Sequence, residues 1–154
     1  MIGELRQQGM FLSKKIISAR VIEAPKQISR KLKIPLGHKV YEYIRCRSVD
    51  YVPAILETAY IDCQKYPDFD QHYTENTSMD YIFKNVYHKN QTSGEEHISV
   101  TYASADEAQI MEVTPHAPLF FTSGVIMDEN SIPIMYYKQL IRSDRFKFVS
   151  EIYK

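Results

Sequence analysis

The chain has 154 residues and a mass of 18.0 kDa, with 19 basic and 19 acidic side chains. This length predicts one domain over residues 1–154, because two full domains would each be short of residues for a core. The apolar share of 44% and the aromatic share of 12% exclude a disordered chain. The apolar runs are far shorter than the ~20 residues that a membrane span needs, so we expect no membrane association.

Charge is unevenly distributed along the sequence although its total is near zero. Residues 1–50 hold eleven Lys and Arg against four acids, whereas residues 51–154 hold eight against fifteen. A basic half of this kind can attract anions or nucleic acid. The alternative is that the two halves interleave in one fold and cancel. We favour this alternative because the lysines are spread over several predicted elements.

The histidines and cysteines give no sign of a metal site. Cys46 and Cys63 lie in apolar, strand-like segments, and neither they nor the five histidines have the spacing of metal ligands or of a disulfide framework. The sequence also lacks a glycine-rich phosphate loop and a nucleophile elbow. The first residues lack the apolar segment of a signal peptide. We therefore expect no metal, no cofactor, no catalytic residue and a cytoplasmic location.

In the first half of the chain, β-branched runs predict strands and apolar residues at i and i+4 predict a helix, with Pro and Gly at the boundaries. The expected elements are, in order, a helix at 4–8, a strand at 15–22, a helix between Pro25 and Pro35, and two strands at 40–48 and 54–61 joined by a hairpin loop.

The second half begins with a polar, irregular segment at 62–77. Beyond it we expect, in order, a helix at 79–86, a polar turn at 88–95, a strand at 96–103, a helix opened by the capping box Ser104–Glu107, two long strands at 119–127 and 132–141, and a last strand with Phe146 and Phe148. Together the elements predict an α+β fold, a mainly antiparallel β-sheet flanked by short helices.

Two arginines are the most informative side chains. Strand alternation places Arg45 and Arg47 on one face, about 7 Å apart. Two guanidiniums can hold one anion, because the planar fork matches carboxylate and phosphate. Glu57 on the return strand could neutralise one arginine or accept a hydrogen bond from a ligand. The alternative is a cross-strand ion pair on a solvated sheet, which contributes little.

Two serines are weaker candidates for the same anion. Ser78 stands at the start of a predicted helix, where free amides can bind an anion, although most such residues only cap the helix. The Ser13-Lys14-Lys15 turn before the first predicted strand is a similar weak candidate. The aromatic residues could instead form a stacking platform for nucleic acid, as at Tyr136-Tyr137-Lys138. We do not favour that reading, because no helix-turn-helix is visible and the total charge is not basic.

Six segments follow one another in a distinctive order. They include the hairpin pattern Arg45-x-Arg47, Pro53 and Glu57, and the helix start at Ser78. The full set is 4–14, 24–37, 45–57, 78–87, 105–119 and 128–148. In this order and spacing the segments resemble the UTRA domain, the effector-binding module of GntR-type bacterial transcription regulators of the HutC subfamily.

The resemblance implies a chorismate-lyase-like fold, a homodimer and a pocket for a small-molecule effector. It also implies that the pocket signals to an N-terminal winged-helix DNA-binding domain, absent from this chain, which in a repressor controls transcription. This sequence departs from the family pattern at three positions. Asp80, Met135 and Ser143 stand where members carry a tyrosine, a glutamate and a glycine.

We therefore predict a ligand-sensing domain for a small anion, most simply a phosphorylated sugar. Arg45 and Arg47 would hold the anionic group, and Glu57 would orient Arg47 or a ligand hydroxyl. Ser78 and Ser13 would add donors, and Tyr136 would line the pocket. Two alternatives stay open. One is a chorismate-lyase-like enzyme in which an arginine grips a substrate carboxylate and Glu57 acts as the acid. The other is a dimerisation module with a degenerate pocket.

Overall fold

A tight turn at Asp50 and Tyr51 organises the centre of the sheet. Both residues have positive φ, 49° and 66°, and a two-residue turn of this kind matches the twist of the strands it joins. The turn connects β2 (Lys39–Val49) to β3 (Val52–Asp62). The computed structural model describes residues 11–145.

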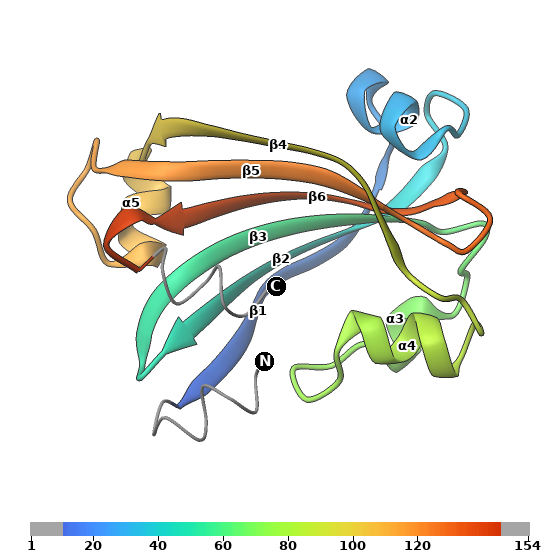
Figure 1. Ribbon diagram of the computed structural model, residues 1–154, viewed down its shortest axis with the longest axis horizontal. Helices are drawn as coiled ribbons and strands as arrows, with labels where there is room; N and C mark the ends of the chain where they lie inside the picture. Colours follow the sequence, from blue (N-terminus) through green and yellow to red (C-terminus); the bar gives the residue numbers. More distant parts are fainter. Residues whose placement is uncertain (1–10, 146–154) are drawn as a thin grey trace.

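All strand pairs of the six-stranded sheet are antiparallel, in the order β1-β2-β3-β6-β5-β4 (Figure 1). The remaining strands are β1 (Leu12–Glu23), β4 (Thr92–Tyr102), β5 (Pro118–Met127) and β6 (Pro133–Arg142). The helices are α2 (Lys26–Leu32), α3 (Phe69–His72), α4 (Met79–Asn85), α5 (Ala105–Met111) and the 3₁₀ turn η1 (Ser143–Arg145). The predicted α+β class is confirmed.

Helices cover both faces of the sheet. Helix α2 packs on one face through Ile28 and Leu32, and α5 packs on the same face at the opposite end of the sheet (Figure 1). Helices α3 and α4 cover the other face, at the α2 end. None of the described helices is long and apolar enough to cross a membrane.

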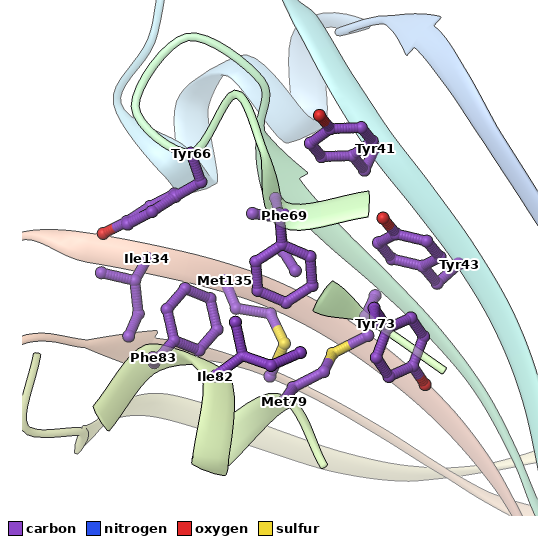
Figure 2. Close-up of a cluster of buried hydrophobic side chains, with 12 residues drawn as sticks. Tyr41, Tyr43, Tyr66, Phe69, Tyr73, Met79, Ile82, Phe83, Ile134 and Met135 are labelled. Atoms are coloured by element: carbon purple, nitrogen blue, oxygen red, sulfur yellow. The ribbon is translucent and has the colours of Figure 1, made fainter. Parts of the chain in front are cut away.

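The α3–α4 layer buries an aromatic cluster against the sheet. Tyr41 and Tyr43 of β2 meet Phe69 and Tyr73 from the α3 segment and Phe83 of α4 (Figure 2). These helices cover only part of the face. Strand β2 continues beyond Tyr43 to Arg45 and Arg47. The side chains of these two arginines are on the same face of the strand as that of Tyr43. The arginines therefore lie on the helix side of the sheet, next to the aromatic cluster.

Several local predictions are confirmed. Ser104 and Glu107 form the capping box of α5. Asp128 closes the predicted β5–β6 turn, because its Oδ1 accepts hydrogen bonds from the backbone amides of Asn130 and Ile132 at 2.8 and 3.0 Å. Helix α2 lies between Pro25 and Pro35 as expected; it ends at Leu32, and the C-cap residue Lys33 adopts a positive φ of 55°.

Two local predictions were wrong. The segment 62–77 is not wholly irregular, since it contains α3, a helix too short to show a periodic pattern. The polar turn at 88–95 is shorter than expected, because β4 begins at Thr92; cross-strand pairing with β5 holds these polar residues in a strand. The predicted helix at 4–8 and the strand with Phe146 lie outside the described residues.

Candidate functional site

A hollow of about 510 Å³ lies between the start of β1, the β2–β3 hairpin and the segment that joins α3 to α4. Its walls include Ser13 and Lys14 of β1, Arg47 of β2, and Glu75 and Ser78 from the segment that joins α3 to α4. This volume is in the range of pockets that enclose small metabolites. Two cations, a carboxylate and the hydroxyls of Ser13, Ser48 and Ser78 therefore surround one hollow.

Hydrogen bonds between β1 and the α3–α4 connection build the wall of the hollow. Lys14 Nζ donates to the carbonyl oxygen of Thr77 at 3.1 Å, and the backbone amide of Ile16 donates to Glu75 Oε1 at 3.1 Å. Ser78 accepts from the amide of Tyr81 and so caps α4. The start of α4 is thereby held against the first strand.

Lys14 is the most perturbed cation of this wall. Partial burial, together with the positive charges of Arg45 and Arg47, lowers its pKa to about 8. Its ammonium also lies 4.9 Å from the centre of the Tyr73 ring. Lys14 is charged at neutral pH in surroundings that disfavour the charge, so an anion in the hollow would relieve an existing electrostatic cost.

Arg45 and Glu57 form a buried ion pair on the same face of the sheet. Arg45 Nε donates to Glu57 Oε1 at 2.7 Å and a second nitrogen, Nη2, donates to the same oxygen. The two side chains are only 4% and 3% exposed. Arg45 Nη1 also donates to the Tyr73 hydroxyl at 3.0 Å, and Gln139 donates to the other oxygen of Glu57.

The charges around Glu57 keep it ionised. Burial alone would raise the pKa of its carboxyl group, but the guanidiniums of Arg45 and Arg47 and the bond from Gln139 outweigh burial and hold the pKa below its ordinary value. Glu57 therefore stays a carboxylate at neutral pH. Its Oε1 accepts both hydrogen bonds from Arg45, and the charge of Arg47 acts on the same carboxylate.

The structure brings some predicted site residues together and separates others. Arg47, Ser13 and Ser78 line the hollow, whereas Arg45 and Glu57 satisfy each other in the adjoining core. Tyr136 lies on the opposite face of the sheet, 2% exposed, with its ring 6.1 Å from that of Tyr60. The structure therefore does not place Tyr136 at the hollow, because the side chains of β6 alternate and position 136 points to the α2 layer.

Of the wall residues, Glu75 was missed, and Lys14 was named only as part of the weak Ser13-Lys14-Lys15 candidate. Lys14 stands opposite Arg47 in the β1–β2 register, and that register is not visible in the sequence. Glu75 lies in the polar segment before α4. None of the three departures from the family pattern lines the hollow: Met135 is 8% exposed in the α3–α4 cluster, Asp80 is exposed in the first turn of α4, and Ser143 begins η1.

The cysteine thiols take no part in this site. Burial raises the pKa of Cys46, and burial together with Asp62 raises the pKa of Cys63 to about 11. Thiols at such pKa values are almost wholly protonated at neutral pH and are poor nucleophiles. Over residues 11–145, no group of histidine, cysteine and acidic side chains is arranged to hold a metal ion.

Comparison with known proteins identifies the fold and the family. The family model of the UTRA domain matches residues 7–147. This chain belongs to the UTRA domain family. UTRA domains are effector-binding regulatory domains of GntR-family transcription regulators, so the family prediction is confirmed and the enzyme alternative is set aside.

The curated relatives are longer proteins. A protein of Escherichia coli K12 described as a probable fructoselysine utilization operon transcriptional repressor is 28% identical over 139 residues, which make up 90% of this chain and 56% of the relative. A protein of Shigella flexneri with the same description matches equally well. The UTRA chain thus spans about half the length of the curated relatives it matches.

Solved structures confirm the architecture. The effector domain of PhnF from Mycobacterium smegmatis superposes with a TM-score of 0.84 at 22% identity, covering 93% of this chain and 88% of that one. The C-terminal domain of Yurk from Bacillus subtilis gives a TM-score of 0.80 at 25% identity, covering 84% and 90%. These likenesses show the shared fold.

The buried ion pair makes the first prediction. Replacing Arg45→Met leaves Glu57 charged and buried without its main partner, so the free energy of unfolding at pH 7 should fall by about 3–5 kcal/mol. The double variant Arg45→Met/Glu57→Leu should recover most of this loss, because it removes both charges. Urea unfolding measures the free energy of unfolding of both variants.

Since the pKa of Glu57 is lowered by folding, the contribution of the ion pair to stability is present at neutral pH and is lost as the pH falls below 4.5.

Arg142→Met is the matched control. Arg142 pairs with Asp144 at 2.8 Å, but the Asp144 side chain is 60% exposed, so this loss should stay within about 1 kcal/mol. An equally small loss for Arg45→Met would contradict the structural role of the buried pair.

Proposed function

We propose that the hollow beside Arg47 binds a small anionic metabolite, a phosphorylated sugar, and that its occupancy controls DNA binding by an attached winged-helix domain. The observation that carries the proposal is the convergence of Arg47, Lys14, Ser13 and Ser78 on one hollow. Guanidinium, ammonium and hydroxyl groups all donate hydrogen bonds to phosphate oxygens.

The charges of the walls favour a phosphate monoester. Arg47 and Lys14 supply two positive charges against a phosphate that carries close to two negative charges at neutral pH. Glu75 and Asn76 line the same hollow and can bond the hydroxyl groups of a sugar. The description of the Escherichia coli relative, a regulator of fructoselysine utilization, supports a sugar-derived effector.

A ligand in the hollow would act on the contact between β1 and the α3–α4 connection. Lys14 donates to Thr77 in the structure described above, and a phosphate would compete for that ammonium. A differential affinity of about 1–3 kcal/mol between two arrangements of this contact is enough for useful coupling to DNA binding. In the bacterial cytoplasm such a domain would act as the sensor of a repressor.

The proposal includes a homodimer that uses strand β4. This strand is at the edge of the sheet, and Ile98, Val100 and Tyr102 alternate along one of its faces with exposures of 59%, 61% and 65%. Within residues 11–145 this strand pairs only with β5, and an edge strand with an apolar face is a suitable surface for a second copy of the chain. If the hollow binds no effector, the domain would remain a dimerisation module.

The effector assignment predicts a specific loss in Arg47→Ala. Hexose 6-phosphates, with the matching free hexoses as controls, should raise the melting temperature of the wild type; at 100 times the dissociation constant the gain is about 2.7 kcal/mol. Arg47→Ala should bind roughly ten- to hundredfold more weakly, because one charge-assisted interaction of about 1.5–3 kcal/mol is lost.

Arg30→Ala, an exposed arginine on α2, is the control and should bind like the wild type. If no phosphorylated sugar raises the melting temperature of the wild type, the sensor proposal is wrong. If a phosphorylated sugar raises the melting temperature of Arg47→Ala as much as that of the wild type, Arg47 does not bind the anion.

Lys14 predicts a pH dependence of the same binding. Its pKa is about 8 in the free protein, and a bound anion would raise it. Affinity should therefore be level below pH 8 and decline above it, by at most about tenfold per pH unit for a single proton. Calorimetry from pH 7 to 9.5 measures this decline. Lys14→Arg, which stays charged throughout, should remove it. A level profile in the wild type would show that Lys14 does not contact the anion.

The dimer proposal predicts that Val100→Lys weakens self-association, since it places a charge in the apolar face of β4. Light scattering should give twice 18.0 kDa for the wild type and a mass closer to 18.0 kDa for the variant. Val21→Lys, an exposed position on the opposite edge strand β1, should leave the mass unchanged. A monomeric wild type, or an effect of Val21→Lys alone, would contradict the use of β4.

A further inference from the structure

A second hollow, of about 740 Å³, lies between α2 and the ends of β4, β5 and β6. It is on the face of the sheet opposite the effector hollow. It is also at the other end of β1, whose twelve residues span about 36 Å. Basic side chains dominate its rim, and the residues around it are Lys26, Gln27, Arg30, Lys31, Lys33, Glu95, Val125, Met127 and Pro133. The fold therefore separates two positively charged hollows by the length of the sheet.

The positive charge of this second surface is uncompensated. Within residues 11–145, the charged groups of Lys26, Arg30, Lys31 and Lys33 form no ion pair and no side-chain hydrogen bond. The carboxylate that borders the same hollow, Glu95, lies 2.7 Å from His97 Nε2. The surface therefore has an excess of positive charge that the described fold does not use.

Stabilisation of α2 does not account for the whole cluster. Arg30 and Lys31 are in the last turn, where a cation interacts favourably with the helix dipole. Lys26 is in the first turn, where the dipole disfavours a cation, and no acidic residue accompanies it there. Positive charge at both ends of so short a helix points to a partner outside the chain.

The spacing of the cations fits an extended polyanion. Lys26 and Arg30 are four residues apart and share one side of the helix, with a rise of about 6 Å, and Lys33 follows directly at the C-cap of the helix. Duplex DNA carries one negative charge per about 1.7 Å of its axis. We propose that the α2 surface binds the phosphodiester backbone of duplex DNA, as an auxiliary contact in addition to any winged-helix domain.

The exposure of these cations favours a nucleic-acid backbone over a small anion. Lys26, Arg30 and Lys33 are exposed on flexible side chains, whereas a small-molecule site encloses its ligand with convergent donors. Lysine and arginine contacts to the backbone position a protein on DNA without reading its sequence. Four of the eleven basic residues in 1–50 meet on this surface. The inference does not depend on what the effector hollow binds.

Fluorescence anisotropy of this chain with a labelled 20-base-pair duplex tests the proposal. Binding should be detectable at 50 mM salt and weaken at 200 mM, with a salt slope of about −0.9 per phosphate contacted. The triple variant Lys26→Gln/Arg30→Gln/Lys33→Gln should bind about tenfold or more weakly at 50 mM salt, and its slope should fall by about 2–3. The matched control Lys15→Gln/Lys65→Gln/Lys84→Gln removes the same charge from exposed positions elsewhere and should bind nearly as the wild type does.

Three results would overturn the proposal. The first is a wild type that does not bind the duplex at 50 mM salt. The second is an equal loss in both triple variants, which would show an effect of net charge alone. The third is displacement of the duplex by micromolar nucleoside triphosphate, which would identify a small-molecule site. Unchanged melting temperatures in both triple variants establish that they are folded, and Arg47→Ala should bind DNA as the wild type does, since the effector hollow is remote.

Discussion

A buried polar chain across four strands is the interaction on which the rest of the structure depends. Arg45 of β2 bonds Glu57 of β3, Glu57 accepts from Gln139 of β6, and Gln139 accepts from Thr122 of β5 at 2.9 Å. These groups are almost fully removed from water. A buried charge without a hydrogen-bonded partner destabilises the folded state, so each of these side chains requires the partner on the next strand. The network therefore specifies how the central strands pair.

Because of this network, Arg45 and Arg47 have different roles. Arg45 is held by Glu57 and Tyr73 and belongs to the core, while Arg47, two residues on, lines the hollow. The anion site of the proposed sensor therefore combines Arg47 with Lys14, the cation opposite it on β1. The positive charge of Arg45 still matters there, because it helps lower the pKa of Lys14 and hold Glu57 ionised.

The sheet also explains how one small domain presents two distinct charged surfaces. One is recessed, with hydroxyl groups and a half-buried lysine, and suits an enclosed metabolite. The other is an open row of cations on α2. They lie at opposite ends of β1 and on opposite faces, so a ligand at one does not obstruct the other. Part of the positive excess of residues 1–50 is cancelled by ion pairs such as Arg45–Glu57, and part of it lies at these two surfaces.

By itself, the sequence determined the elements whose signals lie within a few residues: the turn at Asp128, the capping box at Ser104, and the alternation that pairs Arg45 with Arg47 on one face. The order of these segments also identified the family. The sequence named Ser13 and Arg47, which line the hollow, and Arg45 and Glu57, which lie in the core beside it. Only the tertiary structure decided which arginine faces the hollow, that Tyr136 faces away, and that Lys14 and Glu75 join the wall. Those outcomes rest on strand register and on contacts between residues 59 and 63 positions apart. Such contacts form only when the whole sheet packs, so no local pattern encodes them.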